Sequence, residues 1–446
     1  MKKIIVLSLV ATTMMTAGGQ IDPAESTAET ETEKEWGEIF GQSRTFYIDR
    51  TYSGSIVNNR NSLSSGGYIG YRTPEYNGFS ATVAAYGTYG LDIHDEDADV
   101  VGSASYDPSL YGDSFDNYLF VGQAYLSYAF GNTNIKVGRQ RLDTPLAGAD
   151  DARMLPNLFE AVLLSNKEVE NTTLIAAHVM KETVGTFGNV YGTPSALSLQ
   201  SGYGLGYKLG TGGDFADMGE IALGEGVDTD GVTALAAIYA KGGLKVQAWD
   251  YVAWDILNAV YLQADFGWNC LLNDAVKMKA SVQFINESDI GDSLAGSVDV
   301  NYFGVKLAAA FDAFSAYAAY SSTGDDADTV TNGGVITPWG GMPAFTQGMV
   351  TRHQFFANTD SWKVAASYNF KAYGLKASVY YTEFDIGREN TYDNGNAWTA
   401  SESGWDVQYK VASVEGLSLR ARANYPRDFK EGLDWDEYRL IVNYNF

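Results

Sequence analysis

The last nine residues of the chain, 438–446, alternate between apolar and mostly polar side chains. The residues of the apolar set are Tyr438, Leu440, Val442, Tyr444 and Phe446. Since successive side chains of a β-strand point to opposite faces, this period of two predicts a strand with one apolar and one mostly polar face. The pattern recurs along most of the chain, which predicts an all-β protein.

Four earlier segments show the alternation clearly, at residues 276–284, 362–370, 405–411 and 417–425. A soluble β-sandwich also alternates, so the period alone does not decide the class. Aromatic residues near the ends of the apolar faces, such as Trp362 and Phe370, are typical of the interfacial girdles of a membrane barrel. The polar faces carry Lys and Arg, which a solid core would not tolerate unpaired. We therefore predict a transmembrane antiparallel β-barrel.

The connections between these segments alternate between short and long, as in an outer-membrane barrel with turns on one rim and loops on the other. The long connections are residues 90–117, 142–157, 182–231, 286–298 and 323–360. A strand on each side of every link gives about eighteen strands, an even number that places both termini at the periplasmic rim. Residues 193–230 form one loop or hide a hairpin, so sixteen to twenty strands stay open. A barrel of this size encloses water.

The N-terminus predicts export. Residues 1–19 combine two lysines, a short apolar stretch and small residues near a cleavage point, the plan of a signal peptide. The apolar stretch is too short for a membrane anchor. Residues 20–42 form an acidic periplasmic leader, and residues 43–446 form the barrel domain. The expected location is the outer membrane of a Gram-negative bacterium.

Composition excludes several functions. A net charge of −25 argues against nucleic-acid binding, and the single cysteine, Cys270, excludes a disulfide framework and cysteine-based metal sites. With three histidines and no nucleophile–base pair that spacing supports, we predict no enzymatic activity. A plugged transporter or an autotransporter would need a further domain, which the chain has no room for.

Residues 133–166 carry a motif that resembles the OprD family of outer-membrane porins. The matching residues are Val137, Gly138, Gln140, Pro145, Asp151, Arg153, Pro156, Phe159 and Glu160. Residues 44–52 and the terminal Phe446, a feature of barrels delivered by the barrel assembly machinery, also fit. The long segment 182–230 and the acidic loops look closer to the related major porins of the campylobacter group. The resemblance implies eighteen strands and a third extracellular loop, residues 142–157, that folds inward to narrow the pore.

The charged residues in and beside this loop are candidates for the pore constriction, because rings of charged side chains set pore selectivity. They are Arg139, Arg141, Asp143, Asp150, Asp151 and Arg153. Solvated loop charges are the alternative interpretation, but Pro145 and Pro156 stiffen the segment and its apolar residues favour burial. Asp150 and Asp151 are also weak calcium candidates, although no EF-hand spacing is present. No other cofactor is expected.

A second basic group lies near the C-terminus, with Arg420 and Arg422 on one strand face. If the last hairpin pairs symmetrically, Arg422 lies near Arg439, and placing these charges toward lipid would cost roughly 2–4 kcal/mol each at the midplane. We therefore predict a lumenal basic wall of Lys410, Arg420, Arg422 and Arg439. The alternative is that neighbouring carboxylates such as Asp406 balance them. The resemblance also implies an arginine ladder.

The sequence thus predicts a passive diffusion channel for ions and small hydrophilic solutes. The acidic loops predict a weak preference for cations. The first alternative is a channel specific for carboxylate-bearing solutes such as amino acids or peptides, guided by the basic wall. The second is a surface β protein or adhesin without a channel. Expected partners are outer-membrane lipid, lipopolysaccharide and the barrel assembly machinery, and a homotrimer stays open.

Overall fold

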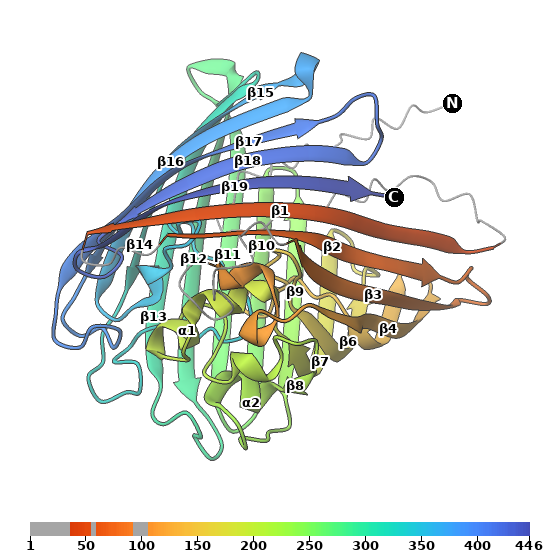
Figure 1. The fold of residues 1–446 in the computed structure, drawn as a ribbon, viewed down its shortest axis with the longest axis horizontal. Coiled ribbons are helices and arrows are strands. Elements are labelled where there is room, and N and C mark those ends of the chain that lie inside the picture. Colours follow the sequence, from red (N-terminus) through yellow and green to blue (C-terminus); the bar gives the residue numbers. More distant parts are fainter. Residues whose placement is uncertain (1–35, 55–58, 92–105) are drawn as a thin grey trace, which may run out of the picture.

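A computed structural model describes residues 36–54, 59–91 and 106–446 and shows one closed antiparallel sheet (Figure 1). Within these ranges the sheet has eighteen long strands and the two-residue β8 (Ala216–Asp217). The long strands of the first half are β1 (Glu38–Gly54), β2 (Arg60–Arg72), β3 (Phe79–Leu91), β4 (Tyr118–Phe130), β5 (Thr133–Gln140), β6 (Leu158–Asn166), β7 (Thr172–Thr183), β9 (Val232–Lys241) and β10 (Leu244–Ala253). Those of the second half are β11 (Leu257–Cys270), β12 (Asn273–Asp289), β13 (Asp299–Phe311), β14 (Phe314–Thr323), β15 (Thr359–Phe370), β16 (Leu375–Ile386), β17 (Trp398–Lys410), β18 (Leu417–Arg427) and β19 (Leu433–Asn445). The predicted eighteen-stranded barrel is confirmed.

Neighbouring long strands pair in chain order, and β1 pairs with β19 to close the sheet, from Gln42 opposite Asn445 to Gly54 opposite Leu433. The first strand begins at Glu38, so residues 38–42 belong to the barrel. The predicted boundary, which assigned residues 20–42 to the leader, lies five residues too late. The reason is that Glu38 to Gln42 find partners on β2, from Arg72 to Tyr68. The predicted signal peptide and the leader up to residue 35 lie outside the described residues.

The outer face of the barrel is apolar, as the alternation predicted. On β13, for example, Phe303, Val305 and Leu307 are each exposed, while the intervening Lys306 faces the interior. Exposed aromatic residues lie near both ends of the outer strand faces, and among them are Trp362, Tyr368, Phe370, Tyr438 and Phe446. In a bilayer this arrangement places an apolar band between two aromatic girdles.

Short turns join the strands at the rim that holds the C-terminus. Gly416 in the turn before β18 has φ +78°, and a Cβ there would lie 2.0 Å from the carbonyl oxygen of Asn445. Only glycine fits this left-handed position beside the last strand. By the convention of outer-membrane barrels, the rim of short turns faces the periplasm.

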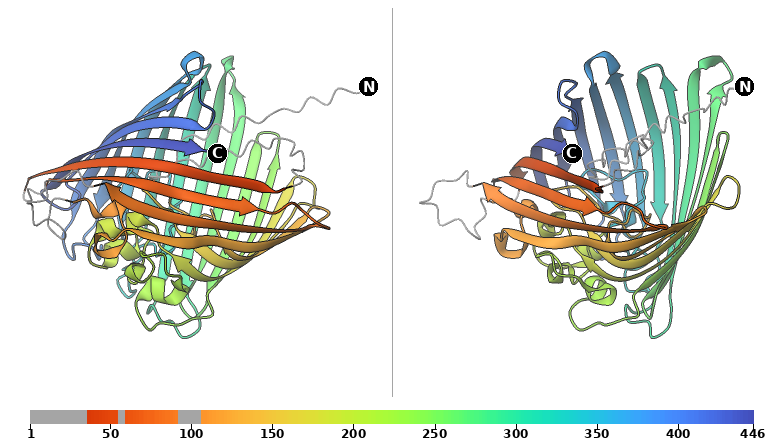
Figure 2. Two further views of the ribbon diagram at one scale, coloured as in Figure 1. Left: turned by 45° about the vertical axis from the view of Figure 1, so that its right-hand side comes forward. Right: turned by 90° about the vertical axis from the view of Figure 1, so that its right-hand side faces the viewer.

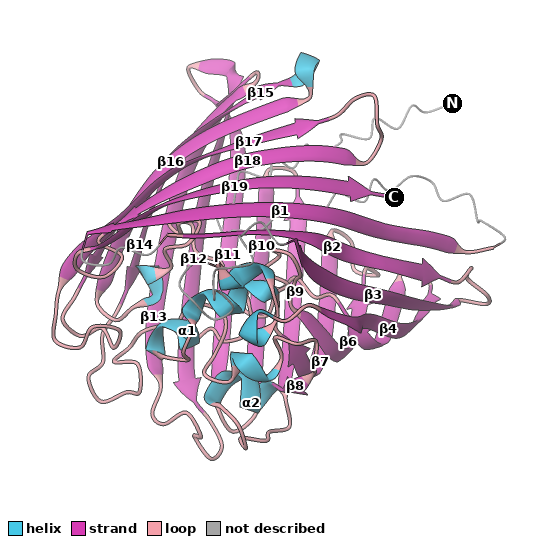
Figure 3. Ribbon diagram, in the orientation of Figure 1, coloured by secondary structure: helices cyan, strands magenta, loops and turns pink. Residues whose placement is uncertain are grey.

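Long loops occupy the opposite rim, and their short helices gather at that end of the barrel (Figures 2 and 3). The helices are η1 (Pro108–Leu110), η2 (Asp113–Phe115), η3 (Thr186–Tyr191), α1 (Ala196–Leu199), η4 (Tyr207–Leu209), α2 (Met218–Leu223) and η5 (His353–Phe355), and η6 (Lys371–Tyr373) lies in a turn at the other rim. Residues 184–231 hold four of these helices and β8, so the uncertain segment 193–230 is one loop without a barrel hairpin. In the described ranges, no helix is long and apolar enough to cross a membrane.

Three long loops pack inside the barrel and form its main buried cluster. Residues 141–157, 184–231 and 324–358 contribute Leu146, Tyr203 and Trp339, which pack against the inner face of β9 to β13. The Trp339 indole nitrogen donates a hydrogen bond of 3.0 Å to the carbonyl of Met218, which joins two of the loops. The loops thus fill much of the lumen and define where solutes could pass.

Candidate pore constriction

The predicted constriction loop leaves the sheet after Gln140 and crosses the inside of the barrel before β6. The Asn157 side chain fastens it at its far end, donating to the carbonyl of Gly148 (3.1 Å) and accepting from the backbone N–H of Gly185 (2.7 Å). The Thr186 hydroxyl accepts from the backbone N–H of Met154 at 3.1 Å. The predicted inward fold of residues 142–157 is confirmed, and contacts to the next loop, at Gly185 and Thr186, hold its far end.

Asp151 lies between two arginines. Its carboxylate accepts two hydrogen bonds from Arg44 of β1, at 2.6 and 3.2 Å, and one from Arg141 at 3.3 Å. Burial opposes ionisation of this carboxyl, but the two guanidinium groups outweigh burial and hold the pKa of Asp151 below its usual value. Asp151 is therefore an anion that fixes the loop to the barrel wall.

Asp150 joins all three inward loops at one point. Its Oδ2 accepts from Arg352 Nη2 at 2.9 Å and from the Tyr203 hydroxyl at 2.7 Å. The Arg352 guanidinium also donates to the carbonyl of Ser201 (2.6 Å) and lies 4.4 Å from the ring centroid of Phe187. Burial would lower the pKa of Arg352, but Asp150 raises it above the ordinary value, so this buried guanidinium is charged.

Arg153 occupies a fully buried site beside the C-terminal strand. Its Nη2 donates to Glu437 at 2.9 Å, and its Nε donates to the Ser109 hydroxyl at 3.0 Å. Glu437 also binds Arg50 of β1 at 2.6 Å and lies 3.2 Å from Arg439. Three arginines therefore share one carboxylate at the junction where the barrel closes.

Arg141 and Asp143 are the members of the predicted set that reach open space. They form an ion pair of 3.0 Å, with side chains 23% and 47% exposed. Burial would lower the pKa of Arg141, but Asp151 and Asp143 raise it. The stacked rings of Tyr68 and Tyr86, 4.8 Å apart, lie on the inner wall nearby. We call this group of four residues, Arg141, Asp143, Tyr68 and Tyr86, the eyelet.

The structure places Arg139 elsewhere. It shares a strand face with the exposed Val137, so it points outward, where it lies 3.5 Å from Glu160 and 4.2 Å from the ring centroid of Phe215. The cause is that β5 keeps its alternation up to Gln140, and only beyond that residue is the chain free to turn inward. Arg139 is therefore not brought together with the other five residues.

The predicted basic wall is partly assembled. Arg422 pairs directly opposite Arg439, as the symmetric hairpin predicted. Asp406 lies beside them, 2.6 Å from Arg420 and 3.2 Å from Arg422, so the alternative in which a wall carboxylate balances the arginines has geometric support. Lys410 ends β17 at the periplasmic rim, exposed and apart from this group.

Loop 324–358 was not predicted to fold inward, yet it follows the inner wall from β12 to β19. Glu402 of β17 accepts from the backbone N–H groups of Met349 (2.6 Å), Val350 (3.1 Å) and Thr351 (2.8 Å). At the end of the loop, His353 Nε2 bonds with the carbonyl of Phe429 at 2.7 Å. The signal in the sequence was the apolar run of residues 335–344, which a fully solvated loop would not carry.

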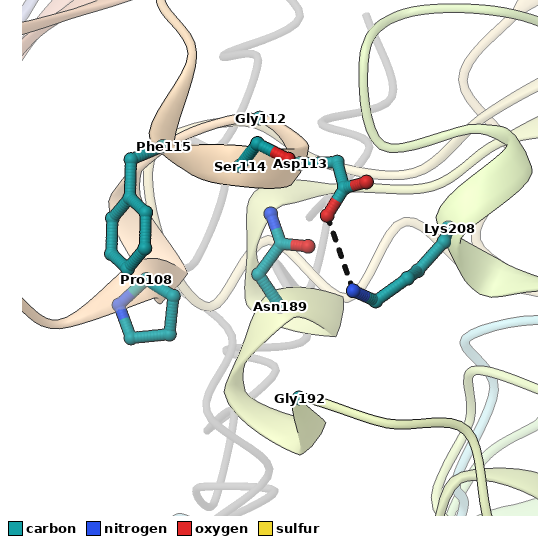
Figure 4. A pocket seen from close by; sticks show the side chains of 8 residues that line it. All are labelled: Pro108, Gly112, Asp113, Ser114, Phe115, Asn189, Gly192 and Lys208. Carbon is teal, nitrogen blue, oxygen red and sulfur yellow. Dashed lines mark hydrogen bonds and ion pairs between the residues drawn. The ribbon is translucent and has the colours of Figure 1, made fainter. Parts of the chain in front are cut away.

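A cavity of about 460 Å³ opens at the extracellular mouth, between residues 108–115 and 189–208 (Figure 4). An ion pair of 3.3 Å between Asp113 and Lys208 spans it. Within the described ranges, no three histidine, cysteine or acidic side chains gather around one point. The weak calcium candidates Asp150 and Asp151 each bind an arginine.

A closed barrel with an apolar outer face and charged loops folded into its lumen defines a porin of the outer membrane. Residues 38–446 match the sequence profile described as outer membrane porin, OprD family. The chain belongs to the OprD family, as the motif at residues 133–166 predicted. A search of curated protein sequences finds no match.

Solved structures of other porins share the fold at low sequence identity. Pseudomonas aeruginosa OccK9 (OpdG) has a TM-score of 0.74 at 20% identity, over 93% of this chain and all (100%) of that chain. P. aeruginosa OccK2 (OpdF) in complex with glucuronate has a TM-score of 0.68 at 16% identity, over 92% and 98%. P. aeruginosa OpdK with vanillate has a TM-score of 0.72 at 17% identity, over 92% and 98%.

Proposed function

We propose that this outer-membrane porin is a passive diffusion channel for ions and small hydrophilic solutes with a weak preference for cations. No catalytic step and no cofactor belong to the proposal. Calcium is not needed, because the Asp150 and Asp151 carboxylates are already neutralised by arginines.

The observation that supports the cation preference is the pairing of the lumenal arginines. Arg44 and Arg352 each bind a carboxylate, at 2.6 and 2.9 Å, and each arginine side chain is 1% exposed. Buried, neutralised guanidinium groups contribute little field to passing ions, whereas the acidic loops at the mouth stay accessible. The half-exposed Asp143 of the eyelet adds a negative group at the narrow part of the pore.

Planar-bilayer recording of the purified protein tests this proposal. Stepwise conductance and a reversal potential of cationic sign in a KCl gradient are expected. An absence of steps would overturn the channel and favour the surface-protein alternative, and an anionic reversal potential would overturn the cation preference alone.

A second candidate is a channel specific for carboxylate-bearing solutes. The eyelet favours it, because Arg141 keeps part of its guanidinium exposed beside two stacked tyrosine rings. Two relatives of the same fold were solved with the carboxylates glucuronate and vanillate. Liposome swelling with glucuronate against an uncharged sugar of similar size tests this: faster entry of glucuronate, lost in Arg141→Gln, is expected, and equal rates would exclude it.

We also infer how the protein reaches the outer membrane and what surrounds it there. Residues 1–19 act as an export signal, and Phe446 is recognised by the barrel assembly machinery. Outer-membrane lipid and lipopolysaccharide surround the aromatic girdles, and both a monomer and a homotrimer stay open. Mass spectrometry of the mature N-terminus and of the detergent-solubilised assembly tests the first and last of these points.

A further inference from the structure

The inner wall of the periplasmic half of the barrel carries a set of lysines. They are Lys136, Lys245, Lys277, Lys279, Lys306, Lys376 and Lys410. Their direction follows from their neighbours: Lys245 lies between Leu244 and Val246, which are both exposed on the outer face. Lys376 shares its inward face with Tyr380, since the exposed Val379 marks the outer face of β16.

These lysines lie close to the short turns. Lys245 and Lys376 are the second residues of β10 and β16, and Lys410 is the last residue of β17. A strand rises about 3.3 Å per residue, so all three lysines, which lie within one or two residues of the rim, are only a few ångströms from it. Lys279 is neutralised by Asp265 at 3.2 Å, but within the described residues Lys245, Lys376 and Lys410 form no ion pair. Their positive charge is therefore available to the solution inside the pore.

The extracellular rim has the opposite sign. In its described loops, carboxylates that are exposed or half-buried include Asp113, Asp116, Asp214, Glu225, Asp228, Asp230, Asp292, Asp325, Asp328, Asp393, Asp428 and Glu431. Apart from Arg141 of the eyelet, the exposed or half-buried basic residues of these loops are Lys208, Arg388 and Lys430. Lys208 is paired with Asp113, and Lys430 is paired with Asp393. At the periplasmic rim, carboxylates such as Glu168 and Asp312 lie in the turns, so the basic character belongs to the wall.

We propose that the pore carries a bipolar profile of fixed charge, acidic at the extracellular mouth and basic on the periplasmic wall, and that it therefore rectifies ionic current. This inference rests on the proposed function as a conducting channel. A potential that is positive on the extracellular side drives cations from the acidic mouth and anions from the basic wall toward the middle of the pore, where both accumulate. The opposite polarity draws both away from the middle and lowers the conductance.

The profile acts only where fixed charges dominate the solution inside the pore. The screening length is about 10 Å at 0.1 M salt and about 3 Å at 1 M. Rectification is therefore strong in dilute salt and disappears in concentrated salt. The bipolar profile also explains how an acidic mouth and a basic inner wall occur in one pore, because each sets the local ion concentrations in a different part of the conduction path.

The test is a current–voltage curve of the full-length mature protein in planar bilayers at 0.1 M and 1 M KCl. Sidedness is read from a biotinylated Asn394→Cys in a Cys270→Ser background, by adding avidin to one chamber. At 0.1 M the current with the extracellular side positive should exceed the reverse current at least about 1.5-fold, and the ratio should approach 1 at 1 M.

The decisive variant combines Lys245→Gln, Lys376→Gln and Lys410→Gln. It should bring the ratio at 0.1 M close to 1. Among the residues that the structure describes, these three lysines have no ion-pair partner whose loss would unfold the barrel. The matched control combines Lys167→Gln, Lys241→Gln and Lys371→Gln, which removes the same charge from the turns and the outer face and should keep the rectification.

Three results would overturn the inference: a symmetric curve in the wild type at 0.1 M, unchanged rectification in the wall variant, or equal loss in both variants. A complete absence of conductance would instead refute the proposed function, so the two failures are distinguishable.

Discussion

Glu402→Gln tests how loop 324–358 is held in the lumen. Glu402 accepts from three consecutive backbone N–H groups, at 2.6–3.1 Å, and from the hydroxyls of Thr351 (2.7 Å) and Tyr380. A glutamine keeps the shape but loses the charge and turns one acceptor into a donor that faces N–H groups. Hydrogen bonds to a charged group contribute about 1.5–3 kcal/mol each, and bonds around one acceptor are not additive. We expect the free energy that docks residues 349–351 to fall by about 2–4 kcal/mol.

Hydrogen–deuterium exchange read by mass spectrometry measures this change in the reconstituted barrel. At 1.4 kcal/mol per tenfold, the expected loss speeds amide exchange of residues 349–351 by roughly 30- to 700-fold. The matched control is Glu383→Gln on the neighbouring strand, whose carboxylate faces outward and accepts from Trp362 (3.1 Å) and Tyr381 (2.8 Å). The control should leave this loop protected.

Unchanged exchange at residues 349–351 in Glu402→Gln would refute the reasoning. It would mean that the other wall contacts, such as the hydrogen bond of 2.9 Å that the Phe345 N–H donates to Gln283 Oε1, hold the loop without Glu402. Equal acceleration in both variants would show a general loosening of the barrel, and it would also contradict the assigned role.

Three further outcomes are expected. Burial lowers the pKa of His353 to about 4, against about 6.5 in an unfolded chain. Above pH 6.5 the neutral imidazole therefore contributes up to about 3 kcal/mol to the docking of loop 324–358, and this contribution is lost as the pH falls toward 4. Limited proteolysis of the loop across this pH range measures the loss, and a rate of cleavage that does not change with pH contradicts it. Asp150→Asn leaves the buried Arg352 without its carboxylate and should cost about 3–5 kcal/mol, seen as a lower thermal transition; a transition within 1 °C of wild type would count against it. Asp143→Asn should move the reversal potential toward anions while changing stability by no more than about 0.5 kcal/mol, and an unmoved potential would remove Asp143 from the conduction path.

Features that depend on the strand period were predictable. The alternation in the last hairpin was enough to place Arg422 opposite Arg439, because a symmetric turn sets the register of the two strands it joins. The inward loop at residues 142–157 followed from the family motif. Both predictions needed only neighbouring strands or local sequence.

Features that depend on distant partners were not predictable. The contacts of Arg153 with Glu437, and of Asp150 with Arg352, join segments that only the closed barrel brings together. No periodicity encodes which carboxylate meets which guanidinium. Arg139, in contrast, was predictable. It lies on the same strand face as the exposed Val137, so the alternation alone indicates that it points outward, and the prediction that it belongs to the constriction did not apply this rule.

The junction between β1 and β19 has a consequence for folding order. The constriction loop is anchored at contacts between the first and the last strand. Arg50 binds Glu437 across a sequence separation of 387 residues, and Arg44 binds Asn443 across 399 residues. Contacts this distant form late, because the loop-closure entropy is lost before they can stabilise the chain. A nascent or partly inserted barrel therefore lacks the residues that hold its constriction loop in place. The constriction and the closed wall therefore form in the same step, so a barrel that has not yet closed lets solutes pass without selection, and only the closed barrel is selective.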